Sequence, residues 1–143
     1  MEGARARKIE GLRHELLELH KTVLDGQRVQ YERAHGRIET SNEFLGLVLH
    51  HPDFDWIRAL SALIAQLDEW SEESEYAGDE GLSGILDALR LLIHPDGGNP
   101  VFARRYWKMV EDDPDVTLAH AKVWRFLHPP RPPGGSHPPR TSK

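Results

Sequence analysis

Three polar side chains lie on the apolar face of a predicted first helix: His20, Gln27 and Tyr31. They are spaced seven and four residues apart, so all three project from one side of an α-helix. Imidazole, amide and phenol groups in such positions either hydrogen-bond within the core and fix the helix register, or line a site for a ligand or metal. For His20 alone, the hydrogen-bonded core residue is the more common outcome.

Two more polar residues occupy core-facing positions on other predicted helices. Asp68 comes eleven residues after Ile57, which places it within about 20° of the same helix face. It is either a carboxylate in a site or a helix-end residue that reaches solvent or pairs with an arginine, and the second is more frequent. His120 lies four residues after Val116 and three before Val123. The candidate ligand-binding residues are therefore His20, Gln27, Tyr31, Asp68 and His120.

The signals for a metal site are few. His20, Asp68 and His120 are the leading candidates, because they fall on apolar faces of different helices and histidine with carboxylate suits zinc or iron. Glu32 and His35 form one Glu-x-x-His pair, whereas di-iron carboxylate proteins use two such pairs. These two residues are secondary candidates, and we expect no cofactor.

Several enzyme signatures are missing from the sequence. It contains no glycine-rich phosphate loop, no G-x-S-x-G turn and no His-Glu-x-x-His helix. It also contains no cysteine, which excludes a thiolate metal ligand, a cysteine nucleophile and a disulfide. A cysteine-free chain fits a reducing compartment, and we expect the cytoplasm.

The charge balance bears on the class of partner. The chain has 143 residues, with 23 acidic and 18 basic side chains and a formal charge of -5. This balance argues against nucleic acid as a partner, since only the groups at 5–8 and 104–105 are locally basic. No apolar run approaches the ~18–20 residues of a membrane span. The first residues also lack the apolar stretch of a secretory signal.

The segment 53–70 is the best-patterned helix and the expected centre of the core. Asp53 follows a proline and is the expected N-cap residue. The apolar residues of this segment recur at spacings of three and four, the period of one helix face. They are Phe54, Ile57, Leu60, Ile64 and Leu67.

Start and stop signals define the remaining helices. Thr40 begins a capping box, Asn99 and Asp113 each precede a proline, and Gly36 is a natural stop. Gly26 lies inside the first helix without breaking its phase, which indicates a weak point or a close contact. We predict an all-α fold, an irregular bundle of about five helices around the central helix. The single domain covers 1–127 and is followed by a proline-rich, disordered tail at 128–143.

Three stretches of the chain together resemble a group of short, uncharacterised helical proteins from bacteria. They are LHKTVLDGQRVQYERAHGRI, DFDWIRALSALIAQLDEW and DPDVTLAHAKV, and the resemblance covers most of the chain up to Phe126. It implies a bacterial cytosolic protein and carries over no activity and no site residue.

Two functional hypotheses follow. The first is a non-enzymatic interaction or regulatory protein with a protein partner, including a second copy in a homodimer. Its basis is the long first helix together with four tryptophans, because aromatic residues left exposed mark interfaces. These are Trp56, Trp70, Trp107 and Trp124. The second hypothesis is a metal- or small-ligand-binding helical bundle, catalytic or not, in which the five polar residues form one buried cluster.

Overall fold

The computed structural model describes residues 2–72 and 79–129, and all regular structure within these two stretches is helical. The prediction of an all-α fold is confirmed. The elements are α1 (Glu2–His35), α2 (Ser41–His50), the 3-10 helix η1 (Pro52–Ile57), α3 (Arg58–Glu72), α4 (Asp79–Leu92), α5 (Pro100–Asp112) and α6 (Pro114–Leu127). Most of the tail predicted at 128–143 lies outside the described residues.

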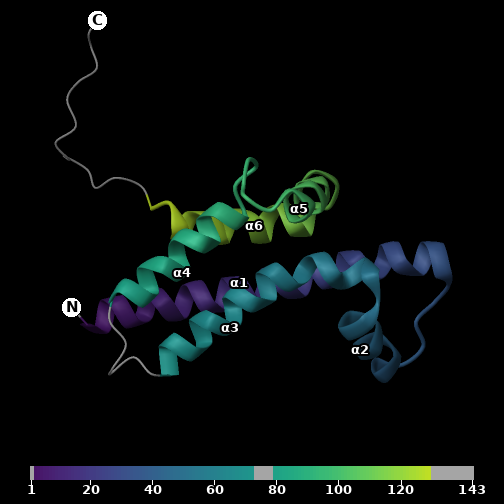
Figure 1. Cartoon of the computed structure of the whole chain (residues 1–143), viewed down its shortest axis with the longest axis horizontal. Helices are drawn as coiled ribbons and strands as arrows, with labels where there is room; N and C mark the ends of the chain where they lie inside the picture. The colour runs from purple at the N-terminus through teal and green to yellow at the C-terminus, as the bar shows by residue number, and fades with distance from the viewer. Residues whose placement is uncertain (1, 73–78, 130–143) are drawn as a thin grey trace, which may run out of the picture.

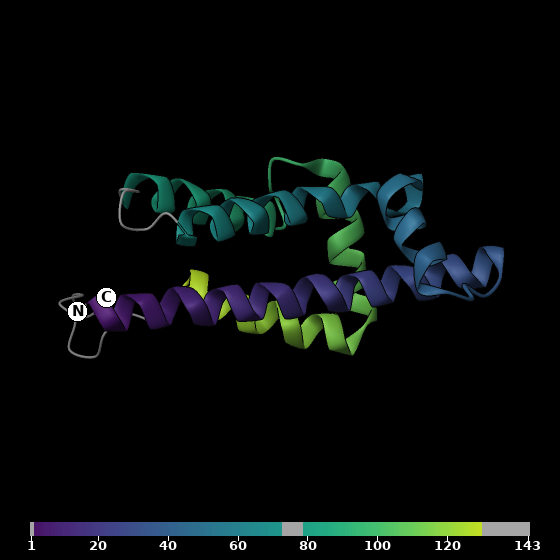
Figure 2. The same cartoon turned by 90° about the horizontal axis from the view of Figure 1, so that it is seen from below.

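The long helices are arranged in two layers. Figure 1 shows α1 running along the length of the molecule, with α2 near its C-terminal end. Seen from below in Figure 2, α1 and α6 form one layer, α3 and α4 form the other, and α5 crosses between them. The element contacts agree, because α1 packs on α6, α3 on α4, and α5 on both α6 and η1.

Local chemistry places the helix ends where the sequence predicts them. The side chains of Thr40, Asn99 and Asp113 each accept a hydrogen bond from a backbone N–H in the first turn of the helix that follows. Gly36 ends α1 with a φ of 95°, a conformation that glycine adopts without steric cost. A Cβ on Gly26 would lie 3.1 Å from the sulfur of Met109, so this glycine marks a close contact of α1 with α5.

The segment 53–70 is not one α-helix, and this part of the prediction is wrong. Its first turns form η1, and the N-cap residue is His51, whose Nδ1 accepts a hydrogen bond from the backbone N–H of Asp53. The 3-10 winding places side chains three residues apart in line. Phe54 and Ile57 are related in this way and are both buried. The tighter winding thus occurs together with the burial of these two side chains. The spacing of apolar residues in the sequence does not distinguish it from an α-helix.

The core draws on every element except α2 for its buried side chains. It contains Leu16 and Leu19 of α1, Leu60 of α3 and Val123 of α6, all fully buried. None of the four tryptophans is exposed: Trp56 is buried and the others are partly buried against the core. The exposed tryptophans on which the interaction hypothesis drew are therefore not found. By contrast, α2 has five large apolar residues and none of them is buried.

Candidate functional site

His20 is half-buried and has one hydroxyl partner. Its Nε2 lies 2.6 Å from Oγ of Ser61 on α3. Oγ of Ser61 also lies 3.4 Å from the carbonyl oxygen of Ile57, so a neutral His20 donates to Ser61, which in turn donates to that carbonyl. Burial lowers the pKa of His20, which favours this neutral form. His20 thus joins α1 to α3 as a hydrogen-bonded residue of the packed interior.

His120 has a similar environment at the opposite side of the core. Its Nδ1 lies 2.6 Å from the hydroxyl oxygen of Tyr106, and the rings of Trp107 and Trp124 pack beside it. Burial lowers the pKa of His120, and the nearby His128 lowers it further. The neutral imidazole accepts the phenolic O–H of Tyr106, whose own pKa is raised by burial. This pair satisfies a hydroxyl that would otherwise be buried without a partner.

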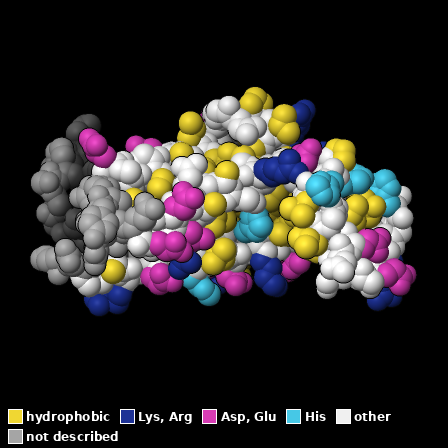
Figure 3. All heavy atoms as spheres, turned by 60° about the horizontal axis from the view of Figure 1, so that its bottom comes forward, with side chains coloured by type: hydrophobic (Ala, Val, Ile, Leu, Met, Phe, Trp, Pro, Cys, Tyr) yellow, Lys and Arg dark blue, Asp and Glu magenta, His cyan; other side chains and the backbone are white. Residues whose placement is uncertain are grey.

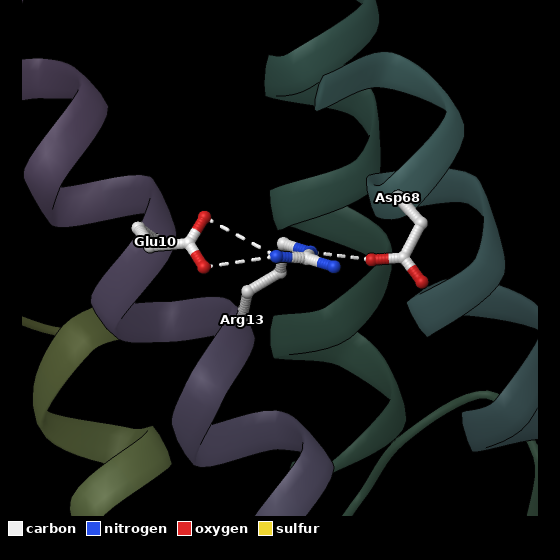
Figure 4. A network of polar contacts seen from close by, with 3 residues as sticks. All are labelled: Glu10, Arg13 and Asp68. Carbon is white, nitrogen blue, oxygen red and sulfur yellow. Dashed lines mark hydrogen bonds and ion pairs between the residues drawn. The ribbon is translucent and has the colours of Figure 1, made fainter. Parts of the chain in front are cut away.

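Asp68 pairs with an arginine, as expected for a helix-end carboxylate. Figure 4 shows Arg13 of α1 between Glu10 on its own helix and Asp68 on α3. Nε of Arg13 donates to Asp68 at 2.5 Å, and its Nη1 donates to Glu10 at 2.9 Å. The side chains of Arg13 and Asp68 are about one-third exposed. Asp68 therefore takes part in a surface network that ties α1 to α3.

The five predicted site residues do not form one cluster. Within residues 2–72 and 79–129, no hydrogen bond, ion pair or ring contact joins any two of them. Gln27 accepts a hydrogen bond from the indole N–H of Trp56 at 2.9 Å. Tyr31 lies beside a group of two histidines and a carboxylate.

That group consists of His35, His51 and Asp53, and we name it the His–Asp cluster. His35 is the last residue of α1, His51 lies between α2 and η1, and Asp53 is in η1. One carboxylate oxygen of Asp53 lies 3.8 Å from Nε2 of His35 and 3.8 Å from Nδ1 of His51. The ring of Tyr31 packs against both imidazoles, at centroid distances of 4.4 Å and 5.1 Å.

Backbone geometry brings these residues together. After the turn at Gly36, a carboxylate oxygen of Glu32 accepts the backbone N–H of Ile38 at 2.9 Å, which fixes the loop against the end of α1. The chain then forms α2 and returns through His51, whose backbone N–H closes the last turn of α2. The start of η1 therefore lies beside the end of α1, with which it is in contact.

The His–Asp cluster can hold a divalent cation. One ligand atom from each residue lies within 4.8 Å of the others. Ligands of tetrahedral zinc are about 3.4 Å apart, given bonds of ~2.0–2.1 Å, so modest side-chain movement would close the site and leave a fourth position open. A neutral imidazole has one nitrogen with a free lone pair. In His51 this nitrogen is Nδ1, which accepts a hydrogen bond from the backbone N–H of Asp53. Metal binding competes with that hydrogen bond, which limits the affinity.

Sequence reasoning identified only part of this cluster. Of the metal candidates, His35 belongs to it, while His20, Asp68 and His120 have separate partners and Glu32 is bound to the backbone of Ile38. His51 and Asp53 were not predicted. The signal that was available is the His-Pro-Asp stretch, which sets an imidazole and a carboxylate on one turn.

Figure 3 shows histidine and hydrophobic side chains lying together at the end of the molecule where α2 lies. Hydrophobic residues of α2 contribute to this surface, since Leu45 and Leu49 are 55% and 51% exposed. The His–Asp cluster adjoins α2 through His51. Two features that can take part in binding therefore occupy neighbouring positions.

Comparison with known proteins finds no family model that matches the chain, and no curated protein or solved structure significantly similar to it. Among the described helices, none combines the length and apolar character needed to cross a membrane. The function therefore has to be inferred from the chain's own residues.

Proposed function

We propose that this chain is a non-enzymatic interaction protein that forms a homodimer through α2. The observation that carries the proposal is that α2 is strongly apolar yet has no buried residue. Leu45 and Leu49 are more than half exposed, whereas most large apolar residues of the other helices are in the core. Adjacent exposed apolar residues on one helix are typical of an interface.

The exposed face of α2 suits a second copy of the same helix. Asn42, Leu45, Gly46 and Leu49 share one helix face, and this face has no formal charge. A Cβ on Gly46 would meet nothing within 4 Å, so a partner helix has room to approach closely. In an antiparallel pair related by a two-fold axis, the leucines of one copy would pack beside Gly46 of the other.

The interior polar groups favour binding over catalysis. His20 and His120 each have a hydroxyl partner within the fold, which suits a role in helix packing. Packing of six helices around a shared core favours the irregular bundle expected from the sequence. We also place the protein in the cytoplasm, on the basis of its cysteine-free composition.

Sedimentation velocity over a range of concentrations tests the homodimer. The wild type should shift from monomer to dimer as concentration rises, because a helix of 10 residues offers only a small interface. Leu45→Glu/Leu49→Glu should stay monomeric. Leu118→Glu is the matched control, because Leu118 is 58% exposed on α6. A wild type that stays monomeric at high concentration, or a control that dissociates equally, would refute the homodimer.

The geometry of the His–Asp cluster supports a second function, divalent-metal binding. Two imidazoles and a carboxylate are the ligand types that zinc accepts, and the open fourth position would hold water. The ring of Tyr31 would restrict the orientation of both imidazoles. The bound ion would connect the end of α1 to the start of η1 and so hold α2 in place.

Isothermal titration of the metal-free protein with zinc tests this second function. We expect one zinc ion per chain for the wild type and none for His35→Ala/His51→Ala. His50→Ala/His94→Ala removes two exposed histidines outside the cluster and should leave binding unchanged. Equal loss in both double variants would point to scattered surface histidines and against the site.

A further inference from the structure

A pocket of about 430 Å³ lies near the C-terminal end of α1, where η1 and α5 meet it. Gln27 and Trp56 form part of its wall, and Arg33, Arg104 and Arg105 line it as well. It shares no lining residue with the His–Asp cluster or with the exposed face of α2. The volume lies within the range of pockets that bind small molecules, roughly 300–1,000 Å³.

The charge of this pocket is opposite to that of the whole chain. Within the described residues, Arg33, Arg104 and Arg105 form no ion pair, whereas Arg13 and Arg58 each pair with a carboxylate. Lys108 and Asp112 also line the pocket and neutralise each other at 3.1 Å. Three exposed guanidinium groups that form no ion pair with any described residue thus line one cavity of a chain with a formal charge of -5.

Gln27 contributes a hydrogen-bond donor from a buried position. Its side chain is 3% exposed, and its oxygen accepts the indole N–H of Trp56 at 2.9 Å. Indole nitrogen is a donor only, so the amide oxygen must face Trp56 and the amide NH2 must face away from it. Within the described residues this NH2 has no partner, yet no side-chain nitrogen or oxygen is both fully buried and unsatisfied. The NH2 group is therefore accessible from the pocket that Gln27 lines.

We propose that this pocket binds a small phosphorylated molecule. Arginine forms paired hydrogen bonds with phosphate oxygens, and three arginines together suit a dianion better than a single carboxylate. The NH2 group of Gln27 would donate to one phosphate oxygen, held in direction by the bond to Trp56. Met109 and the Trp56 ring supply an apolar wall for the rest of the ligand. The arginines would attract the phosphate group, and the fixed amide of Gln27 would orient it.

This assignment changes the interpretation of two residues. In the sequence, Arg104 and Arg105 stand out only as a short, locally basic group. Their position around the same pocket as Arg33 of α1, which comes about 70 residues earlier in the chain, was not visible in the sequence. Convergence of α1 and α5 produces the local positive charge.

Isothermal titration with inorganic pyrophosphate, at low salt and with EDTA, tests the proposal. EDTA prevents binding through a metal ion held elsewhere on the chain. The wild type should bind with saturation, and Arg104→Ala/Arg105→Ala should weaken binding at least tenfold. Arg37→Ala/Arg125→Ala removes the same charge from exposed arginines outside the pocket and should change the affinity less than about threefold.

Gln27→Glu tests the buried donor separately. The substitution keeps an oxygen that accepts from Trp56 but replaces the NH2 group by a second oxygen, so it should abolish pyrophosphate binding in a protein whose circular dichroism shows it folded. If this variant is not folded, the arginine variants decide alone. Absence of saturation in the wild type, or equal weakening by both arginine pairs, would overturn the proposal. So would binding of a short single-stranded RNA in the absence of pyrophosphate binding.

Discussion

Two pairs of histidines in this molecule have opposite surroundings. His20 and His120 lie on the faces of helices that turn towards the core, and each has one hydroxyl partner. His35 and His51 lie at the ends of elements and share one carboxylate, with side chains that are 47% and 28% exposed. The first pair joins neighbouring helices through hydrogen bonds, whereas the second is grouped around a carboxylate at a spacing that suits a shared cation.

The comparison shows where ligand sites arise in a small helical protein. A polar residue on a buried helix face needs a partner from the neighbouring helix, so part of its hydrogen-bonding capacity is used within the fold. Element ends are held by loops and caps, so several polar groups can meet there without burial. The inward pattern of His20 is therefore evidence for packing more than for chemistry.

Replacement of His120 should have the largest effect on stability. His120→Ala leaves the hydroxyl of Tyr106 buried without a partner and removes ring contacts, so we expect a loss of about 1–3 kcal/mol in the free energy of unfolding. His35→Ala should cost less than about 0.5 kcal/mol. Chemical denaturation of both variants measures the difference.

A double variant identifies the cause. His120→Ala/Tyr106→Phe removes the unpaired hydroxyl, so it should lose less stability than the sum of the two single variants. Additive losses would mean that the hydrogen bond between His120 and Tyr106 contributes little.

The change of the free energy of unfolding with pH should reflect the titration of His20 and His120. Burial lowers the pKa of His20 and His120 below the ordinary value of 6.5, and His128 adds to the lowering for His120. The unfolded chain then binds these protons more readily than the folded chain. Stability is therefore complete above about pH 6.5 and is lost as the pH falls towards the lowered pKa values.

Denaturation midpoints between pH 5 and pH 8 check this expectation. His20→Gln/His120→Gln keeps hydrogen-bonding groups that do not titrate, and should flatten the curve below pH 6.5. His50→Gln/His94→Gln, which changes two exposed histidines, should leave the wild-type curve in place. If the control flattens the curve instead, the titration that matters lies on the surface.

Stabilisation by zinc should depend on His35 and His51 and not on His20 and His120. A ligand that binds only the folded state stabilises it by about 1.4 kcal/mol at ten times its dissociation constant. We therefore expect zinc to raise the melting temperature of the wild type and of His20→Gln/His120→Gln. It should not raise that of His35→Ala/His51→Ala. Zinc stabilisation that survives in the last variant would place the ion outside the His–Asp cluster.

The sequence predicted helices better than contacts between them. The caps at Asn99 and Asp113 and the stop at Gly36 depend on a few neighbouring residues, so their chemistry is legible in the chain. The 3-10 winding of η1 was missed because it accompanies the packing of Phe54 and Ile57. A helical period gives the direction of a side chain from its own axis and contains no information about the helix it faces.

The candidate site was harder to predict for the same reason. The stripe that contains His20, Gln27 and Tyr31 is real, yet these residues contact Ser61, Trp56 and the His–Asp cluster respectively. Ser61, Trp56 and His51 lie at different points of the segment 51–61, while His35, also beside Tyr31, belongs to α1 itself. A residue's partners depend on how α1 is oriented against that segment. The spacing of residues along one helix does not determine this orientation.

Replacement of Asp68 should have the smallest effect on the free energy of unfolding. This residue differs from both pairs of histidines because it forms an ion pair at the rim of the core. Asp68→Asn keeps the size of the side chain and removes the charge that faces Arg13. Partly exposed pairs contribute about 0.2–1 kcal/mol, and salt weakens them. We expect a loss in this range at low salt that shrinks at 1 M sodium chloride, measured by urea denaturation. A larger, salt-independent loss would mean that Asp68 acts through buried hydrogen bonds, as His20 and His120 do, and that its position on the apolar face of α3 reflects the core after all.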